Sequence, residues 1–533
     1  MSAVELLKIP PYAFNITLYA YKSSNSRQDA RAAEGGGTLK NRKDQARIAL
    51  ERRQSRTPVF DALRSYVRAG TLSFHVPGHK HGKGLPEFTR FVGRNIMNID
   101  LTIMPDLDSI YKPHGPIAEA QELAAEAFGA EFAHFLSNGT TAGIHCMMMT
   151  TLRPGDKIVV PRNVHKSVVS ALVLTGAEPV YIQPYVDNYL GIAMAITADE
   201  VRQSLRQHPE SKAILLTNTT FYGMAPELER IVEIAEDYEI PVLVDEAHGA
   251  HLCFHPGLPI SAMEAGADMA ALSTHKLLGS MTQSSLLLTR GDLVDHDYTK
   301  TTLNLTQTTS PSYPLLASID VSRKQAFFRG HEMLTHAINI ANWARYEINN
   351  NIPGLYVYGN DLVGQLGCHD YDPTKLCINV RALGITGFEI ERILRQGFHI
   401  QVDLSDLYNV LCVVTIADTK ETVRALVHAL SEIARKYTVQ DVREQVIELP
   451  PIPALAYLPR EAFYADSKRV PLEQAKGKIV AEMLMSYPPG IPLICPGEIL
   501  TQDIIDYVRR LKKADVQIYG TEDPTAEHIK IIR

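Results

Sequence analysis

The 533-residue chain lacks the features that mark membrane, secreted and nucleic-acid-binding proteins. It has no apolar run close to the roughly 20 residues that a membrane span needs, and no secretory hydrophobic segment near its start. Its net charge of −7 gives no basic footprint for nucleic acid or for an anionic membrane. We therefore expect a soluble, intracellular protein whose partners include neither nucleic acid nor membrane.

Cysteine is also scarce. The chain has it at positions 146, 253, 368, 377, 412 and 495, which form no Cys-x-x-Cys pair and no disulfide framework. Most of these residues stand among apolar neighbours, which favours reduced cysteines in the core of a cytoplasmic protein. The sequence also has no solenoid-type repeat and no Gly-x-x-x-x-Gly-Lys-[Ser/Thr] loop, so it predicts neither a repeat array nor a P-loop nucleotide hydrolase.

What is present is an alternation of apolar strands and helical segments. We predict strands at 134–136, 157–160, 178–182, 213–217, 241–244 and 267–272, and helices at 119–128, 142–151, 166–175, 198–207 and 226–238. Such an alternation is typical of a mostly parallel sheet that is covered by helices on both faces. The predicted fold class is therefore α/β, with chemistry at the carboxyl ends of the strands.

The length indicates about three or four structural units. We predict a partly disordered N-terminal extension (1–56), an N-terminal arm (57–100), the large domain (101–330), a small α/β domain (331–450) and a C-terminal domain or tail (451–533). The extension is basic from Lys40 onward, and organellar targeting is an alternative for it. A long helix at 320–349 leads into the small domain, for which we predict strands at 376–380, 400–404 and 410–414 and helices at 387–395 and 420–436.

Lys276 ends the run Ser273-Thr274-His275-Lys276, which follows a predicted strand and precedes several small and hydroxyl residues. A lysine in apolar surroundings loses its charge readily, and a neutral amine can form a Schiff base. Lys276 is therefore a candidate for covalent attachment of pyridoxal 5′-phosphate (PLP). The alternative is a strand-end lysine that pairs with a carboxylate.

A second motif, Ser137-Asn138-Gly139-Thr140-Thr141, follows a strand and opens a helix. Hydroxyls, backbone N–H groups and the helix dipole at such a position favour a bound phosphate. An ordinary Ser/Thr N-cap has the same composition, so the motif by itself leaves both interpretations open.

Two further residues stand at the ends of predicted strands. Asp245 lies in Val244-Asp245-Glu246-Ala247-His248-Gly249, where an ionised carboxylate can hold a proton on the ring nitrogen of a cofactor. A buried structural aspartate is the alternative. His165 lies between a strand and a helix, where its flat ring can stack on a planar cofactor; a lone histidine at such a place is more often an ordinary loop residue.

A polar loop with three histidines, His75, His79 and His81, stands earlier in the chain. We see no residues nearby that would complete a zinc ligand set, so we predict no metal site. We instead place this loop near an active site, because binding residues concentrate on loops.

In chain order, the phosphate-binding turn, the stacking histidine, the strand-end aspartate and the lysine match a PLP enzyme of fold type I. The sequence resembles the ornithine/lysine/arginine decarboxylases of this fold type, and most of all the short, arginine-decarboxylase-like members without an N-terminal wing domain. The resemblance runs from about Thr57 to about Leu511. Besides the motifs above, it includes Phe74-His75-Val76-Pro77-Gly78-His79-Lys80, Gly115-Pro116-Ile117-Ala118-Glu119-Ala120-Gln121, Thr308-Thr309-Ser310-Pro311-Ser312-Tyr313 and Tyr487-Pro488-Pro489-Gly490-Ile491-Pro492.

The resemblance implies an aspartate-aminotransferase-like large domain with a mostly parallel seven-stranded sheet. It implies the following roles in PLP binding: Lys276 attaches the cofactor, Asp245 pairs with the ring nitrogen, His165 stacks on the ring, and Ala247 and His248 pack beside the cofactor. The residues that hold the phosphate would be Gly139, Thr140, Thr141, Ser273 and His275. In relatives, the loop with Thr308 and Thr309 reaches the cofactor of a neighbouring subunit, which implies at least a homodimer with shared active sites. Longer, winged members carry Trp at the position of His248, so this residue supports the short subgroup.

The implied reaction is decarboxylation of a basic L-amino acid, with arginine to agmatine, a step of polyamine biosynthesis, as the leading assignment. Lys276 or His275 would return the proton to Cα as a general acid. His79, Asp403 and Glu498 are candidates to line the substrate site, and a carboxylate among them could bind a guanidinium bidentately. The alternatives are lysine or ornithine as substrate, a PLP lyase or cyclase acting on an arginine derivative, and a catalytically silent regulatory paralogue.

Overall fold

The computed structural model describes residues 39–439, 449–486, 491–513, 516 and 518–533. The predicted extension up to residue 38 and the motif at 487–490 lie outside these residues. The chain divides into two compact units. The first comprises the described part of Met1–Gly143 with Gly249–Glu264 and Asp268–Leu334, and the second comprises Ile144–His248, Ala265–Ala267 and the described part of Thr335–Arg533.

Seven strands form a mixed sheet in the order β1-β10-β9-β8-β6-β2-β3. They are β1 (Phe132–Leu136), β2 (Lys157–Pro161), β3 (Glu178–Ile182), β6 (Ala213–Thr217), β8 (Val242–Asp245), β9 (Met269–Leu272) and β10 (Ser285–Thr289). Within the second unit, β3, β2, β6 and β8 pair in parallel, with Thr217 opposite Asp245 at the carboxyl end. The α/β class and the predicted strands of this region are confirmed.

Strand β10 was not predicted. It runs antiparallel to both β1 and β9, its partners in the first unit. It follows Lys276 closely, and Ser284 and Ser285 precede its short apolar run Leu286-Leu287-Leu288, which therefore gave a weak strand signal. Strand pairing on both sides buries the whole of Ser285–Thr289, including its polar ends.

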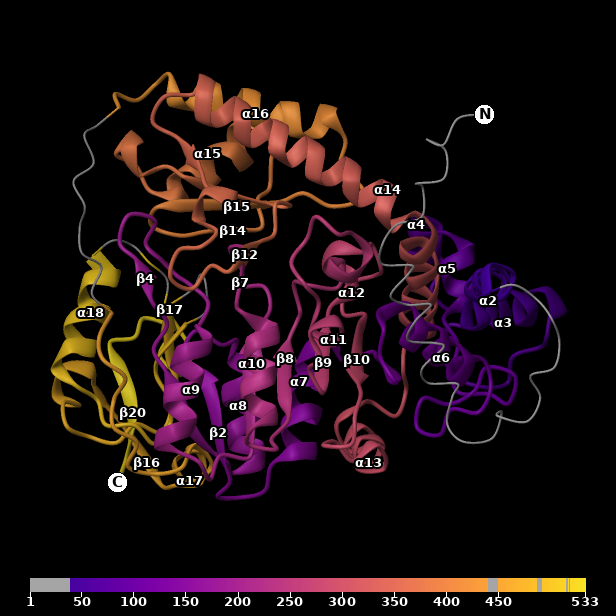
Figure 1. The fold of residues 1–533 in the computed structure, drawn as a ribbon, viewed down its shortest axis with the longest axis horizontal. Helices are drawn as coiled ribbons and strands as arrows, with labels where there is room; N and C mark the ends of the chain where they lie inside the picture. Colours follow the sequence, from indigo (N-terminus) through magenta and orange to yellow (C-terminus); the bar gives the residue numbers. More distant parts are fainter. Residues whose placement is uncertain (1–38, 440–448, 487–490, 514–515, 517) are drawn as a thin grey trace. The chain divides into compact units, whose positions relative to one another are not determined.

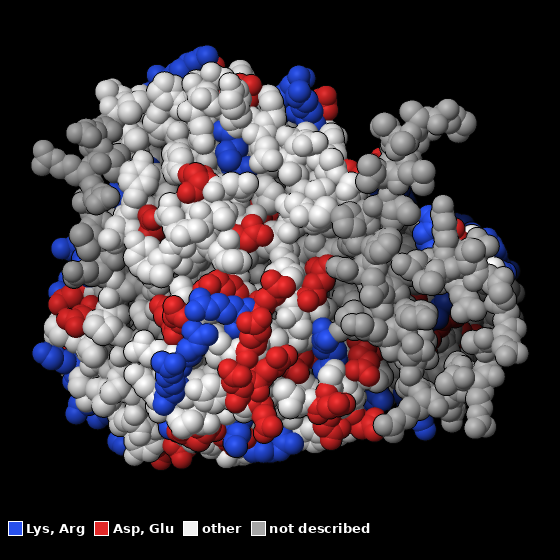
Figure 2. Space-filling model, in the orientation of Figure 1, with Lys and Arg blue, Asp and Glu red and all other residues white. Residues whose placement is uncertain are grey.

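Helices stand between successive strands along the chain, as the predicted alternation of strands and helices requires. They include α7 (Gly139–Thr151), α8 (Lys166–Thr175), α9 (Ala198–Gln207) and α10 (Leu228–Glu236). Helix α9 packs against β2 and β3 and lies beside α10 (Figure 1). On the face shown in Figure 2, acidic and basic side chains lie among one another over these two helices. Arg230, for example, contacts both Asp199 and Glu227 at 2.7 and 2.9 Å.

The N-terminal part of the first unit is helical, with α2 (Leu39–Gln54), α3 (Pro58–Ala69), α4 (Pro86–Val92), α5 (Arg94–Ile99) and α6 (Pro116–Phe128). The motif that begins at Gly115 forms the N-terminus of α6. The buried carboxylate of Asp108 accepts hydrogen bonds from the backbone N–H groups of Gly115 (2.8 Å) and Ile117 (3.1 Å). The backbone of this motif is therefore held at the start of a helix by Asp108.

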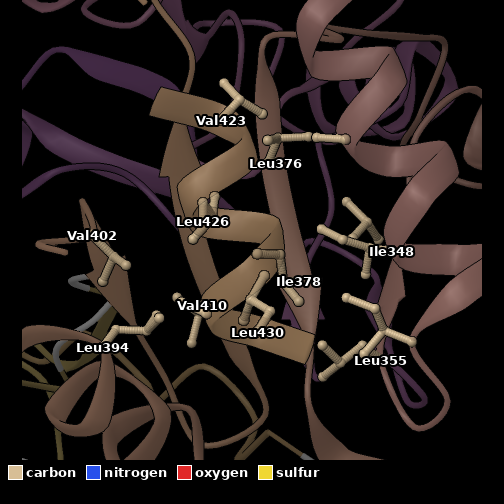
Figure 3. Packing of buried hydrophobic residues seen from close by; sticks show 14 of the residues in the cluster. Ile348, Leu355, Leu376, Ile378, Leu394, Val402, Val410, Val423, Leu426 and Leu430 are labelled. Carbon is tan, nitrogen blue, oxygen red and sulfur yellow. The ribbon is translucent and has the colours of Figure 1, made fainter. Parts of the chain in front are cut away.

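The small α/β domain begins along the long helix α14 (Tyr313–Asn351). Its antiparallel sheet has the order β11-β13-β15-β14, formed by β11 (Tyr356–Val357), β13 (Lys375–Asn379), β15 (Asn409–Val413) and β14 (Leu404–Ser405). Helices α15 (Gly387–Phe398) and α16 (Lys420–Ala434) pack on it. Figure 3 shows the resulting core, in which Leu376 and Ile378 of β13 face Leu426 and Leu430 of α16.

The strand predicted at 400–404 is largely wrong, because only Leu404 lies in a strand. His399, which caps the C-terminus of α15, has a positive φ of 56°. The residues directly after it lead the chain out of the helix and form no strand before Leu404. The other predicted strands and helices of this domain are confirmed within a few residues.

The C-terminal region has its own apolar core, which includes Leu484, Ile494, Ile504, Val508 and Ile529. Its elements are α17 (Pro459–Tyr464), β16 (Ser467–Pro471), β17 (Leu484–Ser486), β18 (Ile491–Ile494), α18 (Gln502–Lys513), β19 (Ile518–Tyr519) and β20 (His528–Ile532). The remaining short elements are β4 (Val186–Asp187), β5 (Ile192–Ala193), β7 (Met224–Ala225), α11 (Ala262–Ala265), α12 (Thr274–Leu277), α13 (His296–Thr306) and β12 (Asp370–Tyr371).

All six cysteines are free thiols, and five of them are buried. Across the helices that the structure describes, none combines the length and the apolar composition that crossing a membrane requires.

Candidate active site

In the first unit, three hydroxyl groups from three elements meet at the start of α7. The Oγ1 atom of Thr140 lies 2.5 Å from Oγ of Ser273 and 3.0 Å from Oγ of Ser285. Ser273 follows β9, and Ser285 begins β10. Hydroxyl donors beside the positive end of a helix dipole favour an anion such as a phosphate group.

Two glycines allow this arrangement. Gly139 starts α7 with a φ of +73°, which side chains rarely adopt. A Cβ atom at Gly143 would lie 2.9 Å from Cβ of Ala271 and from Cδ1 of Leu136, so the helix approaches β9 and β1 more closely than any other residue would allow. Thr141, predicted to bind phosphate, is exposed on the first turn of the helix.

Lys276 lies on the short helix α12, directly after β9, and its side chain is half-buried. A hydrogen bond joins α12 to the residue directly before β10, because the hydroxyl of Thr274 donates to the carbonyl of Ser284 at 3.1 Å. His275 lies beside it, with its Nδ1 atom 2.8 Å from the same carbonyl. A carbonyl only accepts, so Nδ1 carries the proton.

The protonation of His275 bears on its predicted role. Burial lowers the pKa of His275, and the neighbouring Lys276 acts in the same direction, although the hydrogen bond to Ser284 opposes them. In the neutral ring, Nε2 is an acceptor. His275 therefore donates a hydrogen bond to a phosphate through Nε2 only when that phosphate has drawn a second proton onto the ring.

The loop that contains Thr308 and Thr309 follows α13. Gln307, at its start, accepts a hydrogen bond through Oε1 from the backbone N–H of Ser137 at 3.3 Å. The loop thus contacts the turn that opens α7. Thr308 accepts a hydrogen bond from the N–H of Ser310 at 3.2 Å, and Thr309 is exposed.

In the second unit, Asp245 is the last residue of β8 and is buried. Its Oδ1 atom accepts a hydrogen bond from the N–H of Ala247 at 3.2 Å. Its carbonyl accepts one from the N–H of Asn218, which follows the parallel strand β6, at 3.0 Å. Neighbouring strand ends therefore fix the aspartate at the carboxyl edge of the sheet, where α/β proteins bind their ligands.

His165 is the N-cap of α8, which follows β2. Its Nδ1 atom accepts a hydrogen bond from the N–H of Ser167 at 3.3 Å and lies 2.8 Å from the hydroxyl of the same residue. The second contact limits rotation of the ring. Because β2, β6 and β8 run parallel, His165 lies at the same edge of the sheet as Asp245.

Three residues after Asp245, the buried His248 is held on two sides. The ring of Phe221 lies 4.8 Å from it at an angle of 57°, and Nζ of Lys375 lies 3.3 Å from its Nδ1 atom. Ala247 is half-buried beside it.

Glu498 does not fit its predicted role in substrate binding. It is 1% exposed and forms a bidentate ion pair with Arg162, with distances of 2.6 and 2.8 Å. One of its oxygens also accepts the N–H of Cys495 at 2.8 Å. Both oxygens are used, so Glu498 serves as a structural partner of Arg162 and is not available to a substrate cation.

Replacing Arg162 by methionine should destabilise the protein by about 3–5 kcal/mol, because it leaves Glu498 as an unpaired buried charge. The matched control is Arg230→Met, whose ion pairs lie at the surface and contribute about 0–1 kcal/mol. Denaturant unfolding of both variants measures the difference. Equal stability of the two would show that the buried pair has no structural role.

The other two candidates for substrate binding lie in different surroundings. His79 contacts Asp100 through Nε2 at 3.1 Å and accepts the N–H of Gly82 through Nδ1. Asp403 is exposed just before β14. His75 contacts the hydroxyl of Tyr66 at 2.8 Å. Among the residues described, no cluster of three or more His, Cys, Asp or Glu side chains forms a possible metal site.

The predicted cofactor residues thus fall into two sets, one in each unit. The hydroxyl set with Lys276 suits a phosphate and an aldehyde, and the set of Asp245 and His165 suits a pyridine ring. The chemistry of the donors therefore fits PLP. Sequence reasoning did not single out four residues that contact predicted site residues, namely Ser285, Gln307, Ser167 and Lys375. Among these four, only Ser167 had a local signal, as a hydroxyl in the first turn of a helix two residues after His165.

Comparison with known proteins extends this picture. Residues 57–422 match the family model of the Orn/Lys/Arg decarboxylase major domain, and residues 441–525 match that of the Orn/Lys/Arg decarboxylase C-terminal domain. The chain is 46% identical over 483 residues to the arginine decarboxylase of Bacillus subtilis (strain 168), covering 90% of this chain and 98% of the relative. It is also 46% identical over 484 residues to the arginine decarboxylase of Halalkalibacterium halodurans, with the same coverage.

Among solved structures, the lysine decarboxylase LdcF of Francisella novicida is similar in fold. Its TM-score is 0.79 at 24% identity, and the match covers 93% of this chain and 84% of that one. The structure of this chain therefore has the fold of a known decarboxylase.

Proposed function

Because the chain belongs to the Orn/Lys/Arg decarboxylase family and is an amino-acid decarboxylase, we propose that it uses PLP to convert L-arginine to agmatine and CO₂. The observation that carries the choice of arginine is the 46% identity to arginine decarboxylases over 90% of the chain. The donor sets described above support the choice of cofactor. Agmatine formation places the enzyme in polyamine biosynthesis.

When bound, PLP supplies an electron sink for the bond that breaks as CO₂ leaves. We assign the phosphate to the hydroxyls of Thr140 and Ser273, together with Gly139, Thr141 and His275. Lys276 is the residue that attaches the aldehyde. The close hydroxyl contacts around Thr140 preorganise donors where negative charge will lie, so little reorganisation is needed on binding.

Asp245 would keep a proton on the ring nitrogen of bound PLP, because a buried carboxylate favours a neighbouring cation. The hydrogen bond that Oδ1 of Asp245 accepts from the N–H of Ala247 holds this oxygen in place. His165, whose rotation Ser167 limits, holds the plane of the ring. Ala247 and His248 pack beside it. Together these residues would hold the bound cofactor in one orientation while the carboxylate is lost.

After CO₂ departs, a general acid must return a proton to Cα. Lys276 and His275 are the candidates, because they are adjacent on α12. The proton on Nδ1 of His275 is bonded to a carbonyl, which favours Lys276 as the donor. Asp403 and His79 stay candidates for recognition of the substrate.

We also propose a homodimer or a higher homo-oligomer that shares active sites through the loop with Thr308 and Thr309. In the first unit, the arm carries unusually exposed apolar side chains. Phe74 is 95% exposed, Phe91 is 91% exposed and Leu72 is 82% exposed. Exposed apolar surface of this kind marks an association site. A cytoplasmic location is supported by the six free cysteines.

Turnover of arginine, lysine and ornithine by the PLP-loaded enzyme, with the amine product identified, tests this proposal. We expect agmatine from arginine as the main product. Preferred formation of cadaverine or putrescine would reassign the substrate, and conversion of an arginine derivative without CO₂ would indicate a lyase or cyclase. No reaction with any of them would indicate a silent regulatory paralogue.

A further inference from the structure

The proposed function gives no role to Lys375, the first residue of β13, although its side chain is 0% exposed. A buried ammonium is costly unless charged or hydrogen-bonding partners compensate for lost hydration. Burial lowers the pKa of Lys375, while the carboxylates of Asp372 and Asp403 act in the opposite direction. A lysine in this position therefore needs an explanation.

The position of Lys375 is closely defined. Its carbonyl accepts hydrogen bonds from the hydroxyl of Tyr371 and from Nη2 of Arg345, each at 2.9 Å. Gly223, with a φ of +100°, makes room for the side chain. A Cβ atom at Gly223 would lie 3.0 Å from Cγ of Lys375 and 3.1 Å from Cε2 of Tyr371. Backbone and stem are thus both fixed, so the ammonium group has little freedom.

This fixed group lies 3.3 Å from Nδ1 of His248. The carboxylates of Asp372 and Asp403 favour the charged form of Lys375, and in that form the ammonium only donates hydrogen bonds. Nδ1 of His248 then accepts, and the single proton of the neutral imidazole lies on Nε2. Phe221 contacts the same ring at 4.8 Å. Lys375 and Phe221, which lie far from His248 in the sequence, therefore determine the orientation of its ring and the nitrogen that carries its proton.

We propose that Lys375 is a positioning residue for the decarboxylation, because it holds His248 in the Nε2–H tautomer that donates a hydrogen bond to an anionic oxygen of the bound ligand. This inference rests on the proposed function, which places the ligand beside Asp245, three residues before His248. The oxygen belongs either to the ring of the cofactor or to the carboxylate of the amino acid. Both are anionic acceptors that a neutral imidazole N–H suits.

The tautomer is measured first, on the full chain without cofactor. Imidazole ¹⁵N chemical shifts of histidine-labelled protein, with His248 assigned by comparison with His248→Gln, should show the Nε2–H form in the wild type. In Lys375→Met the shifts should move towards a mixture of tautomers. A wild-type Nδ1–H tautomer would overturn the proposal, even if the variant does not fold.

Kinetics then test whether Lys375 acts through His248. We expect Lys375→Met to lower kcat/KM by about 10-fold or more, and the double variant with His248→Ala to be no slower than His248→Ala alone. Lys157→Met, which removes a lysine paired with Glu210 at the surface, is the matched control and should keep wild-type kinetics. Additive effects of the two substitutions would contradict the proposal. So would lower thermal stability of Lys375→Met with unchanged kcat/KM.

Two binding measurements identify the acceptor. If it is the ring oxygen, the Kd of PLP for the apo-protein should rise in Lys375→Met. If it is the substrate carboxylate, the Kd of PLP should stay constant and KM for arginine should rise, while inhibition by agmatine, which lacks the carboxylate, stays the same. A change in none of these values would overturn the proposal. The proposed function is tested separately, on the wild-type enzyme alone. It would fail if the wild type showed no absorption of bound PLP or did not turn over arginine, whatever the Lys375 variants show.

Discussion

Replacing Lys276 by alanine should lower kcat for arginine decarboxylation by at least about 10³-fold, because the enzyme loses its cofactor attachment and a general acid together. The hydroxyls of Thr140 and Ser273, to which we assign the phosphate, lie on neighbouring segments and remain in the variant. We therefore expect the variant still to bind PLP, without the absorption band of covalently attached cofactor. Steady-state CO₂ release and the visible spectrum measure the two effects.

The matched control is Lys468→Ala, which removes an exposed lysine of β16 in the C-terminal region. It should keep wild-type turnover and spectrum. Turnover of Lys276→Ala within tenfold of the wild type would contradict the assignment of Lys276, whatever the spectrum shows.

Replacing Asp245 by asparagine should lower kcat by about 10²–10³-fold, the size expected when a preorganised charge contact in a buried site is lost. Asparagine preserves the shape and can still accept the N–H of Ala247, so the fold should be unchanged. Asparagine lacks the negative charge that, in our proposal, holds a proton on the ring nitrogen of PLP. Single-turnover measurements with saturating PLP separate this effect from weaker cofactor binding.

For this second substitution, Asp199→Asn is the control, because it removes an exposed aspartate that pairs with Arg202 and Arg230 on the same unit. No loss of activity is expected from it. An active Asp245→Asn enzyme would assign Asp245 the structural role that its sequence context also allows.

Much of the fold could be predicted because local signals agree with tertiary packing. The strands 178–182 and 213–217 and the helices 166–175 and 198–207 were predicted with the boundaries that the structure has. Each is an apolar or amphipathic run with clear ends, such as the capping box of Thr197 and Glu200. The predicted domain boundaries at residues 56, 100, 330 and 450 stay predictions.

The site residues that could be predicted are those whose chemistry is rare at their position, such as a lysine after an apolar strand. Residues recruited by tertiary contact could not be found in this way. Ser285 reaches Thr140 across 145 residues, and Lys375 reaches His248 across 127. Glu498 is a residue that the sequence wrongly suggested for the substrate site. The sequence gives no sign that its carboxylate is paired with Arg162, 336 residues earlier.

Covalent attachment of PLP to Lys276 tests the central claim most directly. The protein is incubated with PLP, reduced with borohydride, digested and analysed by peptide mass spectrometry. We predict a pyridoxyl phosphate adduct on Lys276, at near one per chain, that forms poorly when arginine is present during reduction. An absence of adduct on Lys276, or modification spread over surface lysines, would contradict the account.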